Sequence, residues 1–337
     1  MKYILAILAL GVMIIVHELG HFIMAKLNNV KVEDFSIGMG PKIFTYKGKE
    51  TNYSLSLLPI GGYVTMYGQD EEVDDDRGLL SKSPLRRISI SIAGIFMNFL
   101  LAIVIFTAVL GHFGYTETKI DKLTDDGALM EAGVEEGSII KEINGSKILT
   151  YYDIALCNDI SQGKELNIKY EYKGKDKSIT ITPKPIVEDG VERYIMGATF
   201  TRNTDPSIGA SITQSFKQTG TLVKQTVKTL INLVTGKGSF KNDLGGPVTV
   251  VKMSAQAAES GLWDLIYLVG LMSISLAVFN LIPFPALDGG WTLMLIIELI
   301  TRKKVPDKAM AVMNGIGFIL LMILMVAVTV KDLIYVA

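Results

Sequence analysis

The residues best suited to chemistry are His17, Glu18 and His21, inside an apolar stretch that runs from Tyr3 to Met24. Side chains four residues apart project from one face of a helix, so both imidazoles can bind one metal ion with Glu18 beside them. Ionisable side chains are costly within a membrane-spanning helix, which makes this group a candidate functional site. The pattern predicts a Zn²⁺ site with His17 and His21 as ligands and Glu18 as the general base. The alternative is a short core helix whose buried histidines are hydrogen-bonded.

A catalytic zinc site usually has three protein ligands, so the third must come from elsewhere in the chain. The segment from Phe279 to Trp291 ends an apolar run and contains Pro283 and Pro285, which cannot both continue a regular helix. Backbone freed at membrane depth must line a buried or water-filled cavity, and Asp288 in this break is the candidate third ligand. Taken alone, the break is equally consistent with an ordinary loop that contains an Asp turn. Beside the histidine pair, the metal interpretation is favoured.

The composition is that of a membrane protein. Of the 337 residues, 49% are hydrophobic, and they are concentrated in blocks rather than spread evenly. The net charge of −1 gives no global field that would attract nucleic acid. The single cysteine, Cys157, excludes an intramolecular disulfide framework and a cysteine-based zinc finger. Four apolar stretches are long enough to span a bilayer core and predict a polytopic α-helical membrane protein, namely residues 3–25, 88–112, 264–284 and 312–335.

Basic residues next to the spans predict the orientation of the chain. Lysine and arginine are frequent in the loop 26–87 and in the connection between the last two spans, which holds Arg302, Lys303, Lys304 and Lys308. Both segments are therefore expected in the cytoplasm, with both termini and residues 113–263 outside it. The histidine pair then lies toward the cytoplasmic side of an inner or plasma membrane. The first span could be mistaken for a signal peptide, but its length and metal motif predict a retained helix.

Two features suggest how a substrate could be held near the histidine pair. Short β-type runs at Lys42–Tyr46 and Tyr53–Leu58 predict a hairpin whose free edge could bind an extended chain by strand addition. A plain surface hairpin is the alternative. In the second span, Gly94 and Asn98 lie four residues apart. Asn98 either bonds to a neighbouring helix, which Gly94 allows to approach closely, or reaches a substrate backbone.

The region that follows the second span is soluble in composition. It contains short alternating runs separated by glycine and charged residues, and one helical stretch. Residues Gly127–Gly145 resemble the PDZ domains of bacterial membrane-associated proteases, with a short helix, a strand and an Asn-Gly turn. Such modules bind chain ends or strands, or act only as spacers or gates. Apolar residues at helical spacing over 207–235 predict an amphipathic helix on the outer membrane face, or a core helix packed on the PDZ-like module.

These elements predict four regions in the chain. Residues 1–112 hold the first two transmembrane helices, the His-Glu motif and a membrane-associated β-hairpin on the cytoplasmic side. Residues 113–203 form an inserted, extracytoplasmic β-rich PDZ-like domain, and 204–263 an amphipathic helical linker. Residues 264–337 hold the last two transmembrane helices and the Asn-Pro-Pro-Asp-Gly motif.

Taken together, the motifs resemble the site-2 protease family of intramembrane zinc metalloproteases, and within it the bacterial regulator-of-sigma-E protease type. The matching features are the His17–His21 motif, Gly94 with Asn98, the PDZ-like insert, and Asn280 through Gly290. They cover nearly the whole chain in the order of the family. The insert has room for one PDZ module where the proteobacterial members carry two, so the resemblance is to the form with a single PDZ domain.

The resemblance implies that His17, His21 and Asp288 bind one Zn²⁺ per chain and that Glu18 activates the attacking water. It also implies that the hairpin near residues 43–64 clamps the substrate strand. The residues expected to hold the substrate or orient the site are Gly94, Asn98, Asn280 and, in the hairpin, Tyr53, Leu55 and Leu57. The implied partners are the lipid bilayer and single-pass membrane proteins already trimmed on the outside, such as anti-sigma factors and remnant signal peptides. No nucleic acid partner is expected, and the sequence does not indicate an oligomeric state.

Two other functions are compatible with parts of this sequence. A membrane-anchored PDZ scaffold or chaperone could carry a non-catalytic metal site, in which case Glu18 would be dispensable. An ordinary zinc protease with a site facing the cytoplasm would instead cut soluble proteins such as casein. The presence of both Glu18 and Asp288 favours an active enzyme over a lapsed one.

Overall fold

The computed structural model describes residues 2–69, 73–188 and 191–335. The chain divides into two compact units, residues 1–105 with 225–337 and residues 106–224. We call the first the helical unit and the second the β-rich unit. Two helices, α2 (Pro84–Phe113) and α5 (Ile208–Val234), run from one unit into the other.

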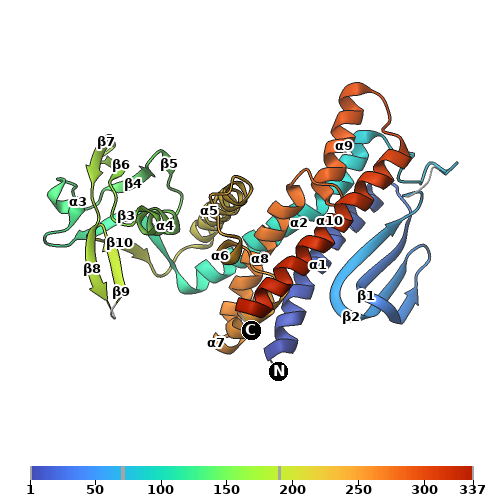
Figure 1. Ribbon diagram of the computed structural model, residues 1–337, viewed down its shortest axis with the longest axis horizontal. Helices are drawn as coiled ribbons and strands as arrows, with labels where there is room; N and C mark the ends of the chain where they lie inside the picture. The colour runs from blue at the N-terminus through green and yellow to red at the C-terminus, as the bar shows by residue number, and fades with distance from the viewer. Residues whose placement is uncertain (1, 70–72, 189–190, 336–337) are drawn as a thin grey trace. The chain divides into compact units, whose positions relative to one another are not determined.

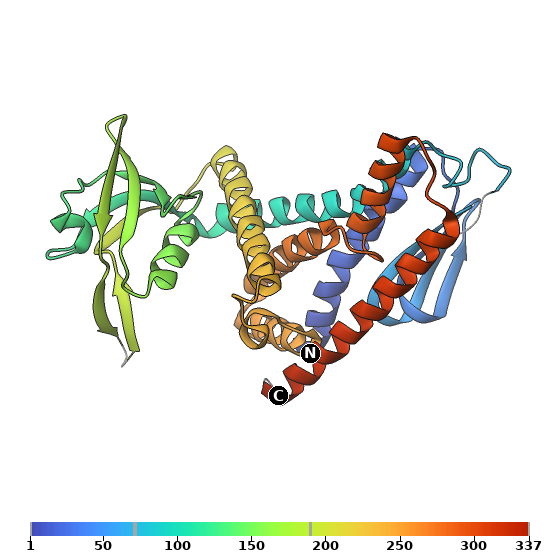
Figure 2. The ribbon, with the colours of Figure 1, turned by 45° about the horizontal axis from the view of Figure 1, so that its top comes forward.

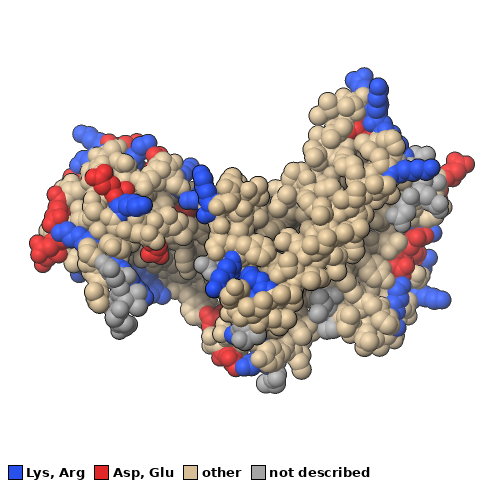
Figure 3. All heavy atoms as spheres, viewed as in Figure 1, with Lys and Arg blue, Asp and Glu red and all other residues tan. Residues whose placement is uncertain are grey.

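Within the described residues, four helices are long and apolar enough to span a membrane, namely α1 (Lys2–Leu27), α2, α8 (Leu262–Leu281) and α10 (Asp307–Tyr335). Large apolar side chains stay exposed along them, among them Phe318 and Ile323 of α10, as expected for surfaces that face lipid. On the face drawn in Figure 3, charged side chains gather at the end of α9 and are scarce along the helices of this unit. These features confirm the predicted class, a polytopic helical membrane protein with a β-rich insert.

The start of α1 and the end of α10 lie at the same end of the helical unit (Figures 1 and 2). Two shorter helices near that end, α6 (Phe240–Asp243) and α7 (Pro247–Ser260), precede α8. Asp332 of α10 accepts a hydrogen bond of 2.8 Å from the backbone N–H of Thr249, in the first turn of α7. This contact attaches the end of α10 to the start of α7, where the chain is broken by Gly245, Gly246 and Pro247.

The break after α8 has a specific structure. The helix ends at Leu281, the chain passes through Pro283 and Pro285, and α9 (Asp288–Thr301) begins. Ala286 adopts a left-handed backbone with a φ of 71°, and its N–H donates to the Asn314 side chain of α10. No element was predicted over α9, which has 14 residues and is too short to span a bilayer.

The predicted hairpin forms, with longer strands than the sequence indicated. β1 (Val32–Lys47) pairs with β2 (Asn52–Met66) through several register shifts, near glycines with positive φ at positions 38, 40 and 61. Because both strands bend, residues 32–37 pair with 62–66 on one side, and 34–37 of them also pair with 52–55 on the other. Val32 and Met66 pack with Ala25 at the end of α1, which attaches the sheet beside that helix.

The β-rich unit contains one main sheet in the strand order β10-β3-β4-β6-β7, with β5 paired to β4. The helices α3 (Ala128–Glu131) and α4 (Tyr151–Ser161) pack on a core that includes Leu129, Ile143 and Ile154. The strands are β3 (Tyr115–Leu123), β4 (Ile139–Ile143), β5 (Ser146–Lys147), β6 (Leu166–Tyr172), β7 (Lys175–Ile181), β10 (Ala198–Asn203), and the separate pair β8 (Lys184–Glu188) and β9 (Val191–Ile195). The alternating runs in the sequence correspond to β4, β6 and β7, and the helical stretch to α4.

The stability of the β-rich unit is expected to fall in acid through Asp153. Burial raises the pKa of this carboxyl, but hydrogen bonds from Lys224, Thr221 and the backbone N–H groups of Leu149 and Thr150 outweigh burial and hold its pKa below the ordinary value. A group whose folded pKa is lowered stabilises the fold above its unfolded pKa, and this contribution is lost as the pH falls through the folded value. Hydrogen exchange at the Leu149 and Thr150 amides of the full chain should therefore accelerate below about pH 4.

The Asp153→Asn variant gives the matched test of this prediction. Its Leu149 and Thr150 amides should exchange faster already at pH 7, because the free energy of opening falls by about 1–3 kcal/mol. Most of the acid dependence of their exchange should also disappear. Asp176→Asn, at an exposed position of β7, serves as the control. An acid dependence that survives in Asp153→Asn would assign it to other carboxyl groups.

Candidate metal centre

Three side chains from two helices converge in the helical unit. His17 and His21 project from one face of α1, and Asp288 from the first turn of α9. The Nε2 atoms of the two imidazoles lie 3.1 Å apart, and Asp288 Oδ2 lies 3.0 Å from His17 Nε2 and 3.4 Å from His21 Nε2. In the described part of the chain, this is the one group of three or more His, Cys, Asp or Glu residues placed to hold a metal ion.

The geometry of the group fits zinc. Ligand atoms 2.0–2.1 Å from a tetrahedral zinc ion lie roughly 3.3–3.4 Å from one another, close to the three separations observed here. Asp288 Oδ2 is buried and has no hydrogen-bond donor among the described residues. A carboxylate oxygen and two ring nitrogens that face one another without a proton between them repel unless a cation lies among them. The nitrogen and oxygen donors are also ligand types that zinc accepts.

Two residues of helix α2 orient the imidazoles by hydrogen bonds to their Nδ1 atoms. The Nδ1–H of His21 donates to the backbone carbonyl of Ile90 at 2.8 Å, which leaves Nε2 as the lone-pair atom. The Asn98 amide nitrogen lies 3.2 Å from His17 Nδ1, and the Asn98 oxygen, which can exchange places with it by rotation of the amide, has no partner. With that oxygen turned toward the ring, Asn98 accepts the Nδ1–H and fixes the same tautomer on His17. Both rings therefore present Nε2 to the site.

Small residues of α2 leave room for the rings. A Cβ atom added to Gly94 would lie 2.5 Å from His21 Nε2 and 2.8 Å from His17 Nε2, so any larger residue would occupy the place of the ligand atoms. Gly20 of α1 permits the same close approach from the other side, because its Cβ would lie 2.4 Å from the carbonyl oxygen of Ala93. The two helices thus meet at glycine on both sides of the histidine pair.

Asp288 is held in place from α2 as well. The Ser91 hydroxyl donates to the Asp288 backbone carbonyl at 3.1 Å and accepts from Thr292, one turn further along α9. The backbone N–H groups in the first turn of α9 also give the carboxylate a favourable position, because the helix N-terminus carries a partial positive charge. Figure 2 shows α1, α2 and α9 side by side at the end of the helical unit opposite the chain termini.

Glu18 lies beside the metal-binding group in a cavity of about 260 Å³. It is half-buried and makes no hydrogen bond or ion pair with the described residues. The cavity is also lined by Tyr63, Val64 and Met66 of β2, and a Cβ atom on Gly62 would lie 3.3 Å from Glu18 Cγ. Among the described residues, 62–66 pair only with 32–37, and on this strand the Met66 N–H bonds to the Gln69 side chain, which leaves the other edge open at residues 62–65 beside Glu18.

The remaining predicted site residues lie outside the lining of this cavity. Tyr53 packs in an aromatic group with Phe22 and Phe35, and Leu55 and Leu57 are exposed; none of the three lines the cavity. Asn280 is half-buried near the end of α8, also outside the cavity lining. Within the hairpin, the residues that line the cavity are Tyr63, Val64 and Met66, the last ones of β2. Their signal in the sequence is the Gly61-Gly62 pair followed by alternating residues.

A buried ion pair closes one side of the cavity. Arg87 of α2 donates to Glu298 of α9 at 2.5 Å and to the backbone carbonyl of Lys82, and its side chain is 3% exposed. Because the Arg87→Leu variant leaves the Glu298 carboxylate buried without its partner, we expect it to destabilise the helical unit by about 3–5 kcal/mol. The measurement is the thermal unfolding midpoint of the full chain in detergent.

Two further variants test this expectation. Arg86→Leu changes the neighbouring, exposed arginine and should leave the midpoint unchanged. The double variant Arg87→Leu/Glu298→Leu should recover most of the loss, because it removes both charges together. A double variant that is no better than Arg87→Leu would mean that packing of the guanidinium, rather than its charge, provides the stability.

Residues 5–324 match the model of peptidase family M50. The chain belongs to this family. Family M50 is the site-2 protease family of zinc metalloproteases, so the resemblance noted in the sequence is confirmed, as are the zinc cofactor and the metalloprotease class.

Relatives within M50 cover nearly the whole chain. A Clostridium perfringens protein whose name marks it as a candidate zinc metalloprotease is 43% identical over 336 residues, which is 99% of each chain. The zinc metalloprotease RasP of Geobacillus kaustophilus is 29% identical and covers 97% of this chain and 96% of its own. The regulator of sigma-W protease RasP of Bacillus subtilis is 28% identical and covers 97% of both.

Proposed function

We propose that this M50 protein is an endopeptidase that cleaves transmembrane segments of single-pass membrane proteins previously trimmed outside the membrane. The observation that carries the proposal is the position of Glu18, unpartnered and half-buried, on the membrane-spanning helix α1 beside the group formed by His17, His21 and Asp288. The name of the Bacillus subtilis relative links it to a sigma factor, which favours anti-sigma factors among the substrates. Remnant signal peptides are a second substrate class.

In the proposed reaction, His17, His21 and Asp288 hold the zinc ion through the atoms described above. Bound there, zinc would supply Lewis-acid chemistry, acidifying a water molecule and polarising the scissile carbonyl. Glu18 takes the proton from the attacking water and returns it to the leaving amine. Ile90 and Asn98 keep the imidazoles in the required tautomer, and Ser91 keeps Asp288 in position.

The open edge of β2 gives the substrate a binding site. A peptide bond in a transmembrane helix is protected by the helix's own hydrogen bonds, so the substrate must unwind locally before attack. Strand addition along residues 62–65 would replace those hydrogen bonds and place the extended chain next to Glu18. Tyr53, Leu55 and Leu57 belong to the same sheet and are 41%, 45% and 58% exposed, so they would contact the substrate outside the cavity.

We infer that both chain termini and the β-rich unit lie outside the cytoplasm. The first and last spans start and end at the same end of the helical unit, as an even number of spans requires. The basic connection after α9 lies at the opposite end and is expected in the cytoplasm. His21 lies six residues before the end of α1, which places the site roughly 9 Å from that end of the helix.

The test uses the full chain in liposomes with three substrates. These are a single-span protein with its outer domain removed, the same protein with the domain intact, and casein. We expect cleavage of the trimmed protein alone, at a position within its span that mass spectrometry can map. A zinc chelator should abolish the cleavage, and added zinc should restore it.

Each other result points to a different function. Equal cleavage of casein would identify an ordinary zinc protease that acts on soluble chains. An absence of cleavage for a panel of trimmed proteins, with zinc bound to the chain, would favour a membrane-anchored scaffold.

A further inference from the structure

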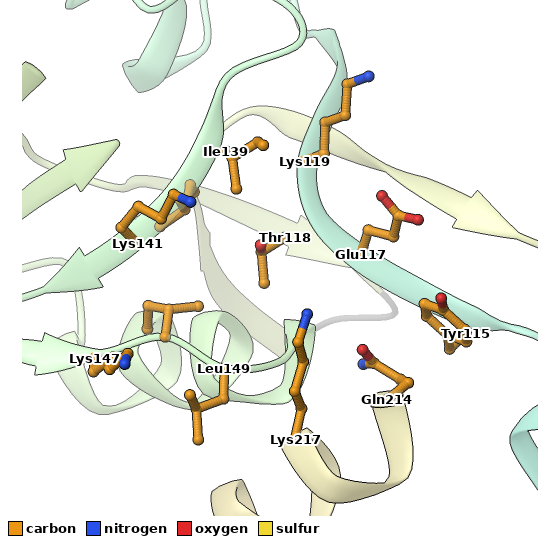
Figure 4. A pocket seen from close by; sticks show the side chains of 12 residues that line it. Tyr115, Glu117, Thr118, Lys119, Ile139, Lys141, Lys147, Leu149, Gln214 and Lys217 are labelled. Carbon is orange, nitrogen blue, oxygen red and sulfur yellow. The ribbon is translucent and has the colours of Figure 1, made fainter. Parts of the chain in front are cut away.

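A second cavity lies within the β-rich unit, apart from the metal centre. It has a volume of about 480 Å³ and is lined by β3, β4, the residues after β5, and the first half of α5. Figure 4 shows the side chains around it, with Lys141 contributed by β4, Lys119 and Glu117 by β3, and Lys217 and Gln214 by α5. None of these residues takes part in the proposed peptide cleavage.

The cavity has an excess of positive charge. Four lysines line it, Lys119, Lys141, Lys147 and Lys217, against one carboxylate, Glu117. Lys141 forms an ion pair with Glu171 at 2.9 Å. The ammonium groups of Lys119, Lys147 and Lys217 have no acidic partner among the described residues. These three lysines are exposed residues at the rim of the hollow, and their uncompensated charges give it a positive potential that attracts an anion.

Gln214 adds a polar group at the base of the cavity. The residue is 7% exposed, and its amide makes no hydrogen bond with the described residues. The amide atoms are open to the cavity, where water or a ligand can satisfy them. In Figure 4 the Gln214 side chain points up toward the hollow, beside Lys217. An anionic group with several acceptor oxygens would satisfy the amide and the lysines together.

The cavity also lies next to the end of a membrane span. Helix α2 has 30 residues and is therefore about 45 Å long, which matches a bilayer with its headgroups. It ends at Phe113, and Gly114, with a φ of 73°, turns the chain directly into β3. Tyr115, the first residue of β3, already lines the cavity. Tyrosine is enriched at this level of a membrane.

Helix α5 supports the same placement. Ile208, Ile212 and Phe216 are spaced four residues apart on this helix and are 78%, 41% and 58% exposed. Such a stripe of apolar residues, next to a basic cavity on the same helix, is typical of a helix that lies in the membrane interface. It favours a lipid over a soluble anion or an acidic peptide as the occupant.

We propose that this cavity binds the phosphate headgroup of an anionic phospholipid, in the leaflet where α2 ends. Lys119, Lys147 and Lys217 supply the positive charge, and Gln214 donates to a phosphate or glycerol oxygen. The acyl chains lie along the exposed apolar residues of α5. The bound lipid would anchor the β-rich unit to the membrane surface at the point where it leaves α2.

The experiment is native mass spectrometry of the full chain in detergent, titrated with phosphatidylglycerol or phosphatidylcholine. We expect one phosphatidylglycerol to bind at least about tenfold more tightly than phosphatidylcholine, because each lysine near an anionic headgroup contributes favourably. The triple variant Lys119→Gln/Lys147→Gln/Lys217→Gln should lose this preference. The matched control Lys122→Gln/Lys164→Gln/Lys175→Gln removes three exposed lysines of the same unit outside the cavity and should keep it.

Gln214→Leu separates a built site from general charge attraction. It keeps all the lysines, and we expect it to weaken phosphatidylglycerol binding about threefold or more through the lost hydrogen bond. Equal lipid preference in the pocket and control variants would overturn the proposal. Binding of inorganic phosphate or of a hexaglutamate peptide to the native chain, with no preference between the two lipids, would also overturn it and assign the cavity to a soluble anion or an acidic protein segment.

Discussion

Glu18→Gln is expected to lower the rate of peptide-bond cleavage by about 10³-fold while the chain keeps its zinc. A general acid–base group typically raises the reaction rate about 10²–10⁴-fold. Glu18 is the carboxylate in the cavity that forms no hydrogen bond or ion pair with a described residue and is not one of the three metal ligands. The glutamine has the same shape but cannot accept the proton of the attacking water. Zinc content stays constant because the ligand atoms belong to His17, His21 and Asp288.

The measurement compares single-turnover cleavage of a trimmed single-span substrate with the zinc content of the same samples. Glu33→Gln, in β1 and paired only weakly with Lys31 at 3.5 Å, is the matched control and should cleave at the native rate. If Glu18→Gln cleaves as fast as the native chain, another group is the base or a contaminant is active. If it loses zinc together with activity, Glu18 acts on the metal centre rather than as a base.

The sequence predicted the parts of the site that depend on local spacing. His17 and His21 share a helical face whatever surrounds them, and two prolines before Asp288 predict a break wherever the helix lies. Long apolar runs predicted the four spans for the same reason, since their lengths match a bilayer without knowledge of their neighbours. The prediction of Asp288 as the third ligand needed one further assumption, namely that the helix break at Pro283 and Pro285 lies next to the helix that carries His17 and His21.

The rest of the site depends on contacts that local spacing does not encode. Ile90 acts through its backbone carbonyl, so its residue type carries no signal. Arg87 and Ser91 share the face of α2 that holds Gly94 and Asn98, at helical spacing, but an arginine near a span end is also an ordinary topological signal. The hairpin near residues 43–64 was predicted to hold the substrate, with Tyr53, Leu55 and Leu57 named in it. The bends that bring its residues 62–66 to the cavity arise from register shifts between β1 and β2, which local spacing does not encode.

Gly94→Ala is expected to remove zinc from the chain and with it all cleavage. The added methyl carbon would lie 2.5 Å from His21 Nε2 and 2.7 Å from His17 Cε1, well inside contact distance. Neither ring can retreat freely, because Ile90 and Asn98 hold their other nitrogens. Loss of an orienting hydrogen bond alone weakens metal binding about 10–100-fold, so a direct clash with both rings should exceed that range.

The measurement is the zinc affinity of the full chain in detergent, by competition with a chelator of known affinity. Gly315→Ala is the matched control, since it is a glycine in the α10 span whose added carbon meets no atom within 4 Å. It should bind zinc like the native chain. Unchanged zinc affinity in Gly94→Ala would mean that α1 and α2 can separate without loss of the centre. The close approach of these helices at Gly20 and Gly94 would then serve packing rather than metal binding.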